Sequence, residues 1–167
     1  FLVEALPPRP QSAGESETHR HTVFLNFAGG TLKAGGNAAE MKAACLGPGE
    51  FQIPGYAGSA ADEQMIVDYV RDRVKAFGLR VVAEAPPKHL PFSQVMFGGH
   101  ASDAGFSAPG LPGLPGNPTL YSEFCITDCG DASRRETGFV FTEEFPDASP
   151  IMAANSALLV LGHYWGL

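Results

Sequence analysis

The sequence lacks both the basic charge of a nucleic-acid-binding protein and the long apolar run of a membrane-spanning one. Its 11 Lys and Arg stand against 18 Asp and Glu, which gives a net charge of -7 at pH 7. Without a run of basic residues, the electrostatic footprint that binds phosphate backbones is missing. No stretch reaches the roughly 18 apolar residues that a membrane-spanning helix needs. We therefore expect neither a nucleic-acid partner nor a membrane span.

Two common catalytic signatures are also missing. The chain has no G-x-S-x-G motif of a serine nucleophile elbow and no phosphate-binding P-loop. The glycine pairs at Gly29, Gly35 and Gly98 are typical of turns. A cysteine nucleophile, Cys125 or Cys129, stays open as an alternative, although no histidine stands out as its partner.

Cysteine is scarce, with Cys45, Cys125 and Cys129 as the three examples. The last two lie too far apart for a redox C-x-x-C motif, and three thiols do not make a zinc ribbon. One disulfide with one thiol left over favours an exported, secreted protein over an intracellular one with three reduced thiols. The spacing leaves open which two cysteines pair.

What is present is the composition of a folded, loop-rich domain. Of the 167 residues, 44% are hydrophobic and 17% charged, and 20 Gly and 14 Pro indicate long connections. Residues 1–20 show no periodicity, so we expect a mobile N-terminal arm there. Residues 21–167 are long enough for a single domain with one core.

The clearest element is a helix from about Ala60 to Phe77, where apolar residues recur at three- and four-residue steps. Ser59 and Asp62 form a capping pattern before it, and Gly78 is a natural stop after it. A second helix follows the Ser149-Pro150 pair, over residues 151–165, and its apolar character on nearly every side predicts burial.

Strands are predicted before, between and after these helices. The alternating or apolar runs that predict them are 22–27, closed by the Gly29 turn, then 79–85, 92–98, a short edge strand at 121–125, and 137–143. A short helix is expected over 38–44, and a long surface loop over 100–118. The order predicts an α/β (α+β) fold: a twisted mixed, mostly parallel sheet of four to five strands with a helix on each face.

The buried second helix ends LLVLGHYWGL and contains His163, a lone imidazole on an apolar helix. By itself such a histidine is most simply hydrogen-bonded in the core. The stretch, however, resembles the active-site helix of metzincin-type zinc peptidases, which reads H-E-x-x-H-x-x-G-x-x-H. In that alignment His163 takes the second histidine position and Gly166 the turn glycine. The order of elements from about residue 22 onward also resembles the upper subdomain of that family.

The resemblance implies zinc as cofactor and peptide hydrolysis as ancestral chemistry, but two positions depart from it. Leu159 stands where the first histidine ligand should be, and Val160 where the catalytic glutamate should be. A peptidase zinc needs three protein ligands and a water position, so zinc is poorly supported and we assign no catalytic residue; His163 remains the one metal-ligand candidate. A natural pseudoenzyme, a truncated product, and a site completed by other residues remain as explanations.

Other polar residues have simpler explanations. His19 and His21 are expected as solvated arm residues, and His89 as a loop residue. His100 with Asp103 could form a metal or acid/base pair, but loop polar residues are usually only solvated. Three carboxylates precede the last helix, where the helix dipole favours them; they are Glu143, Glu144 and Asp147.

The sequence thus supports two functional hypotheses. The first is a secreted metzincin-like peptidase scaffold with a degenerate or incomplete zinc site, inactive as this chain stands. The alternative is a non-catalytic α/β domain that binds a peptide, a protein or a surface through a sheet edge and the cleft beside the last helix. If the resemblance is accidental, only an α/β domain of undefined role remains.

Overall fold

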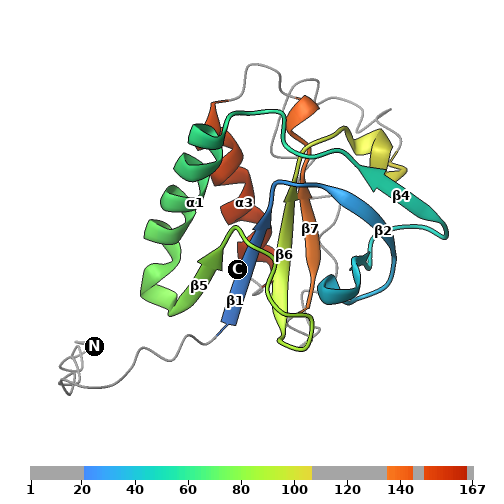
Figure 1. Ribbon diagram of the computed structural model, residues 1–167, viewed down its shortest axis with the longest axis horizontal. Coiled ribbons are helices and arrows are strands. Elements are labelled where there is room, and N and C mark those ends of the chain that lie inside the picture. Colours follow the sequence, from blue (N-terminus) through green and yellow to red (C-terminus); the bar gives the residue numbers. More distant parts are fainter. Residues whose placement is uncertain (1–20, 107–134, 145–148, 165–167) are drawn as a thin grey trace, which may run out of the picture.

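A four-stranded parallel sheet forms the centre of the fold in the computed structural model, which describes residues 21–106, 135–144 and 149–164 (Figure 1). Its strand order is β5-β1-β6-β7, and all three neighbouring pairs are parallel. The strands are β1 (His21–Asn26), β5 (Leu79–Val82), β6 (Phe92–Phe97) and β7 (Thr137–Val140). The predicted α/β class and the mostly parallel sheet are confirmed.

A second sheet, which the sequence did not predict, packs against one face of the first. It has the order β3-β2-β4 and joins β2 (Gly30–Ala34) antiparallel to β4 (Glu50–Ile53) and parallel to β3 (Lys42–Ala43). These strands are too short for a period-two pattern to stand out. The helix expected over 38–44 shrinks to one 3-10 turn, η1 (Ala38–Glu40).

Helix α1 (Ala60–Val74) begins and ends where its sequence signals predict. The Ser59 hydroxyl accepts a hydrogen bond from the Asp62 backbone N–H at 3.2 Å, and the Asp62 carboxylate accepts one from the Ser59 N–H at 3.0 Å. The 3-10 turn η2 (Lys75–Phe77) extends the helix to Gly78, whose φ of 66° is left-handed and ends it. The predicted capping box and glycine stop are confirmed.

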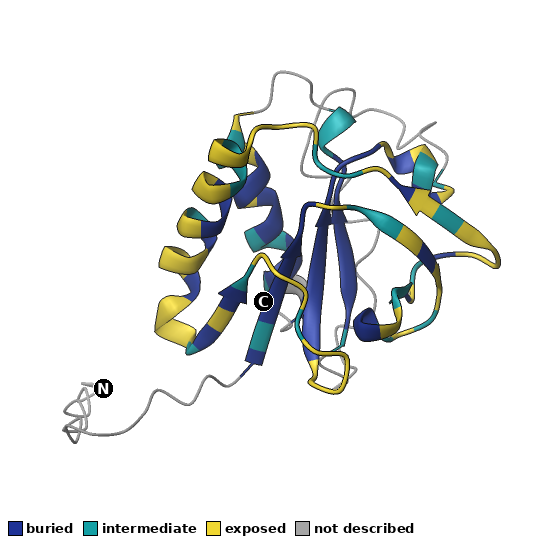
Figure 2. Ribbon diagram, viewed as in Figure 1, coloured by how far each residue is buried: buried dark blue, intermediate teal, exposed yellow. Residues whose placement is uncertain are grey.

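Helix α3 (Pro150–Tyr164) lies beside α1 on the same face of the central sheet, so the predicted placement of one helix on each face is wrong. Residues of both helices and of all four strands share one hydrophobic core there (Figure 2). The handedness rule applies to α1, which connects parallel strands β1 and β5. Helix α3 closes no such crossover in the described chain, so packing decides its face.

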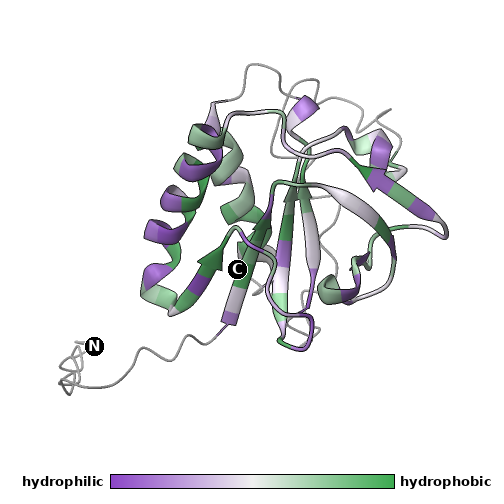
Figure 3. Ribbon diagram, in the orientation of Figure 1, coloured by the Kyte–Doolittle hydropathy of each residue, from purple (hydrophilic) through white to green (hydrophobic). Residues whose placement is uncertain are grey.

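The opposite face of the sheet is covered by the second sheet and by the 3-10 turns η1 and η3 (Ala101–Ala104). Met96 of β6 and Phe139 of β7 pack there against Leu32 and Ile53, and all four side chains are at most 1% exposed. Because the second sheet and the 3-10 turns occupy this face, the apolar residues of α3 pack on the other face of the central sheet, beside α1. Figure 3 shows α1 turning its hydrophilic side away from the sheet.

Within the described part of the chain, neither α1 nor α3 is long and apolar enough to cross a bilayer. This finding agrees with the absence of a membrane-spanning run in the sequence. The predicted N-terminal arm (1–20) and the predicted edge strand at 121–125 lie outside the described residues.

Candidate functional site

The last two turns of α3 carry the positions that resemble a zinc-peptidase helix. Position 163 lies in the final turn, and Leu159 lies one turn before it and is half-buried. Val160, at the position of the family's catalytic glutamate, is 1% exposed and belongs to the main core. The structure therefore places a core side chain where the metzincin chemistry needs a solvated base.

Tight packing against β7 explains the burial of Val160. A Cβ added at Gly138 would lie 2.5 Å from Val160 Cγ1 and would also collide with the Tyr164 hydroxyl. Residue 138 must therefore be glycine, because only glycine lets α3 approach the strand this closely. A longer polar side chain at position 160 would enter this contact instead of a cleft.

Tyr164 links the end of α3 to the central sheet through a hydrogen bond. Its hydroxyl donates a hydrogen bond to the Gln94 carbonyl of β6 at 2.9 Å. Burial, followed by the charge of Glu136, raises the pKa of Tyr164 well above its ordinary value. Tyr164 is therefore a neutral anchor at physiological pH, and it contributes no acid/base group to a site.

A three-ligand metal site is not present in the part of the chain that the structure describes. No group of three or more His, Cys, Asp or Glu side chains comes together in these ranges. Leu159 and Val160 offer no metal-binding atom and no proton acceptor. The described residues of α3 therefore do not fit a catalytic zinc.

The usual ligand site of a parallel sheet is filled by the chain itself. In open α/β sheets, ligands bind at the carboxyl ends of the strands where the strand order changes direction, here between β1 and β6. The segment 53–56 crosses this point, with the Tyr56 N–H donating to the Phe27 carbonyl at 2.8 Å. A Cβ at Gly98 would lie 2.5 Å from the Pro54 carbonyl oxygen, so the backbone of this segment lies directly against the end of β6.

His100 and Asp103, the candidate acid/base pair, do not meet through their side chains. Asp103 Oδ2 accepts a hydrogen bond from the His100 backbone N–H at 2.7 Å. The His100 ring instead lies 3.6 Å from Glu144 Oε1, and that same oxygen accepts from the Ala101 N–H at 3.0 Å. These bonds shape the start of η3. His100 and Asp103 therefore have a structural role. Glu144 contacts η3 and not the N-terminus of α3.

His21 was expected to be a solvated arm residue, and this expectation is wrong. It is 8% exposed in β1, because its ring faces the core side of the sheet. His21 Nε2 accepts a hydrogen bond from the Ser93 N–H at 3.1 Å and lies 3.0 Å from the Ser93 hydroxyl. Ser93 is 2% exposed, so this pair ties β1 to β6 and offers no accessible nucleophile.

The remaining predicted candidates divide into a disulfide, an exposed loop residue and undescribed positions. Cys45 is disulfide-bonded, as the cysteine count predicted. His89 is exposed in the connection between β5 and β6, as expected for a loop residue. The other cysteines, Cys125 and Cys129, lie outside the described residues, as do His19 and Asp147.

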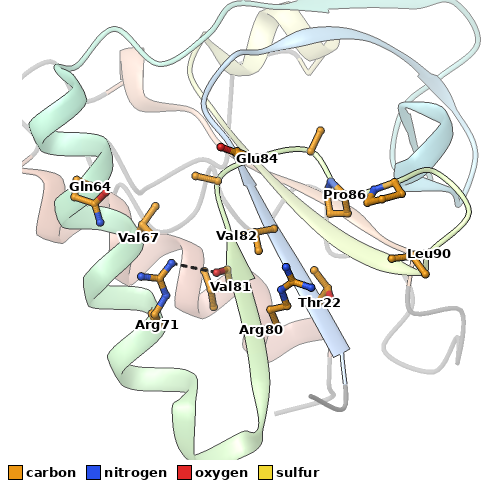
Figure 4. A pocket seen from close by; sticks show the side chains of 13 residues that line it. Thr22, Gln64, Val67, Arg71, Arg80, Val81, Val82, Glu84, Pro86 and Leu90 are labelled. Carbon is orange, nitrogen blue, oxygen red and sulfur yellow. Dashed lines mark hydrogen bonds between the residues drawn. The ribbon is translucent and has the colours of Figure 1, made fainter. Parts of the chain in front are cut away.

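A groove that sequence reasoning missed lies around β5, with Arg71 on the α1 side of the strand and Thr22 and Leu90 on its β1 side (Figure 4). It has a volume of about 430 Å³ and lies between α1, β5 and the segment that follows β5. Arg71 and Arg80 contribute cationic groups to its lining, and Glu84 an acidic one. The one available signal was the Arg80 charge inside an otherwise apolar strand.

No family model matches the chain, and no similar protein was found among curated proteins or solved structures.

Proposed function

We propose that the chain is an exported, metzincin-like scaffold that does not hydrolyse peptide bonds as it stands. The observation that carries this proposal is the burial of Val160 in the core at the position of the family's catalytic base. The order of elements supports the scaffold: three parallel strands and α1 precede β7, and an apolar helix follows it. The disulfide at Cys45 supports export.

The side chains at positions 159 and 160 support the absence of peptide-bond hydrolysis. A hydrolytic zinc site needs three protein ligands and an open water position, with a base that accepts the proton of that water. Leu159 removes one ligand, and Val160 removes the base. His163 alone, as the remaining ligand position, holds zinc too weakly for a catalytic site.

Metal analysis combined with a peptidase assay tests this proposal. The purified chain should contain far less than one zinc per molecule and should not cleave quenched fluorescent peptides, with or without added zinc. His163→Ala should change neither result, and His89→Ala serves as the matched histidine control. One zinc per chain that His163→Ala removes, with peptide cleavage that a chelator stops, contradicts the proposal.

The second candidate function is non-catalytic binding of a peptide through a sheet edge. The groove beside β5 favours it, although it lies next to α1 and not beside the last helix as the sequence suggested. Strand β5 is an edge of the central sheet and pairs with β1 on one side. An extended segment can add to such an edge through main-chain hydrogen bonds. Pull-down of random peptides on immobilised protein tests whether any peptide binds.

A further inference from the structure

We propose that Gln94 and Thr137 hold one internal water molecule between the central sheet and the 3-10 turn η1. Neither zinc binding at α3 nor peptide binding at β5 bears on this site. Three buried side-chain atoms point to it, because they have no hydrogen-bond partner among the residues that the structure describes. They are the amide nitrogen and the amide oxygen of Gln94 and the hydroxyl oxygen of Thr137.

Gln94 and Thr137, the polar pair, are neighbours on the face of the central sheet that the second sheet and η1 cover. They are register partners in the parallel pairing of β6 with β7. Successive side chains of a strand point to opposite faces, so Gln94 shares the face of Met96. Thr137 shares the face of Phe139 for the same reason, and both apolar residues pack against the second sheet.

Bulk solvent does not reach the polar pair. Strands β6 and β7 are buried along their whole length (Figure 2). The exposed fraction is 1% for Gln94 and 2% for Thr137. A hydrogen-bond partner of these side chains must therefore lie inside the protein.

The side-chain amide of Gln94 is the group that most needs a partner. Its main chain is bonded, because the Gln94 N–H donates to the Glu136 carbonyl at 2.7 Å and the Gln94 carbonyl accepts from the Tyr164 hydroxyl at 2.9 Å. The side chain adds two N–H donors and a carbonyl oxygen, and none of them is bonded within the described part of the chain. Buried polar side chains are nearly always hydrogen-bonded, because an unsatisfied group destabilises the folded state.

A water molecule matches this set of atoms. Internal waters make roughly two to four hydrogen bonds to buried polar groups. One molecule can accept from Gln94 Nε2 and donate to Gln94 Oε1 and Thr137 Oγ1. A direct bond between the two side chains would satisfy only one end of the amide, because Thr137 offers a single oxygen atom.

Short side chains of η1 cover the polar pair. Ala38 and Ala39 pack in one cluster with Phe92 of β6. The Ala38 N–H also donates a hydrogen bond to the Arg135 carbonyl, just before β7, at 2.7 Å. Turn η1 therefore extends from β6 to the start of β7, and its two methyl groups leave more room above the polar pair than longer side chains would.

Nuclear Overhauser effects between water and the wild-type chain test the proposal directly. The side-chain amide protons of Gln94 should show cross-peaks to water with the sign of a long-lived, immobilised molecule. The absence of these cross-peaks overturns the proposal. A high-resolution crystal structure in which another side chain of the protein bonds the Gln94 amide, with no water between them, also overturns it.

Oxygen-17 relaxation dispersion, which counts long-lived waters, tests the two residues named. The double variant Gln94→Met/Thr137→Val removes all three polar atoms and nearly keeps the shape of both side chains. It should hold one long-lived water fewer than the wild type, and an unchanged count overturns the proposal. If the double variant does not fold, the Overhauser measurement on the wild type decides.

The matched control is Ser93→Ala, which removes a buried hydroxyl from the opposite face of β6. The Ser93 hydroxyl already has a protein partner, His21 Nε2, at 3.0 Å. Its removal should leave the count of long-lived waters unchanged. An equal loss in the control and in the double variant reports a general loosening of the sheet and overturns the proposal.

Discussion

Helices α1 and α3 have the same length of 15 residues and share one face of the sheet, yet their chemistry is opposite. Helix α1 buries one stripe and carries charged residues on the other side, with ion pairs such as Arg71–Asp68. Helix α3 contains no Asp, Glu, Lys or Arg, and it packs closely on β7. The comparison shows that the helix resembling a catalytic element is a core element, while the exposed helix borders the groove.

The sharpest test of this comparison is Val160→Glu, which introduces the glutamate of the metzincin motif. The variant should lose about 3–5 kcal/mol of unfolding free energy at pH 7, because the folded state must bury a carboxyl group without a partner. Burial raises the pKa of this new carboxyl above its unfolded value of about 4.3. The deficit should therefore shrink as the pH falls from 7 towards 4.3, and it should be smallest below 4.3, where the carboxyl group is protonated in both the folded and the unfolded state.

Urea denaturation at pH 4 and pH 7 measures this difference. The matched control is Leu159→Glu on the half-buried side of the same helix, which should cost clearly less. If the two variants are equally stable, position 160 is not the core position that the structure shows.

Gly138→Ala tests the contact between α3 and β7. The added methyl group would overlap Val160 and Tyr164, and such overpacking costs about 1–3 kcal/mol. Gly36→Ala is the control, since a Cβ there meets nothing within 4 Å, and it should leave the denaturation midpoint almost unchanged. Equal midpoints for the two variants would show that α3 stands farther from β7 than described.

Tyr164→Phe tests the anchor of α3 to β6. Loss of the hydrogen bond to the Gln94 carbonyl should cost about 1–2 kcal/mol at pH 7. Because the folded pKa of Tyr164 is raised above the ordinary 10.0, its stabilisation is complete below pH 10 and is lost as the pH rises further. The difference between wild type and variant should therefore narrow in alkaline buffers.

Thermal unfolding between pH 7 and pH 11 measures this narrowing. The phenol of the unfolded chain ionises above about pH 10 while the buried phenol stays neutral. A constant difference across this range would therefore contradict the raised pKa of Tyr164.

Ser59→Ala tests the exposed helix and should have the smallest effect. The N-cap of α1 should contribute about 1 kcal/mol. The Ser59 hydroxyl and backbone N–H hold the pKa of Asp62 below its ordinary 3.8. This stabilisation is present above pH 3.8 and is lost as the pH falls, so the effect of the variant should diminish in acid.

Ser102→Ala, which removes an exposed hydroxyl at η3, is the control in the same denaturation assay. A larger loss from Ser59→Ala than from Gly138→Ala would reverse the ranking of the two helices.

The elements with long or strongly patterned sequences were predictable. Helix α1 has both its capping box and its glycine stop in the sequence, and β6 has the apolar run Val95–Phe97 followed by the Gly98-Gly99 turn. The second sheet was missed, because β3 has two residues and β4 four, and no periodicity can develop over so few positions. His21 was misjudged because its partner Ser93 is 72 residues away.

The features of the candidate site likewise divide into those that the sequence predicts and those that only the structure shows. That Leu159 and Val160 can supply neither a metal ligand nor a base is a property of the sequence, since neither side chain has an atom for that chemistry. The groove at β5 required the structure, because residues of α1, β5 and the β5–β6 connection line one groove only when α1 packs beside the edge strand.

The sequence by itself therefore determined the α/β class, the ends of α1, the burial of the last helix and the absence of a complete catalytic motif. These properties depend on residue type and on spacings of a few positions. Only the tertiary structure decided that both helices share one face, that segment 53–56 fills the crevice at the strand ends, and that an open groove borders β5. The physical reason is that these features depend on which apolar surfaces pack against each other in the folded chain. Several surfaces compete for the same partner, and short-range sequence patterns do not encode the outcome of that competition.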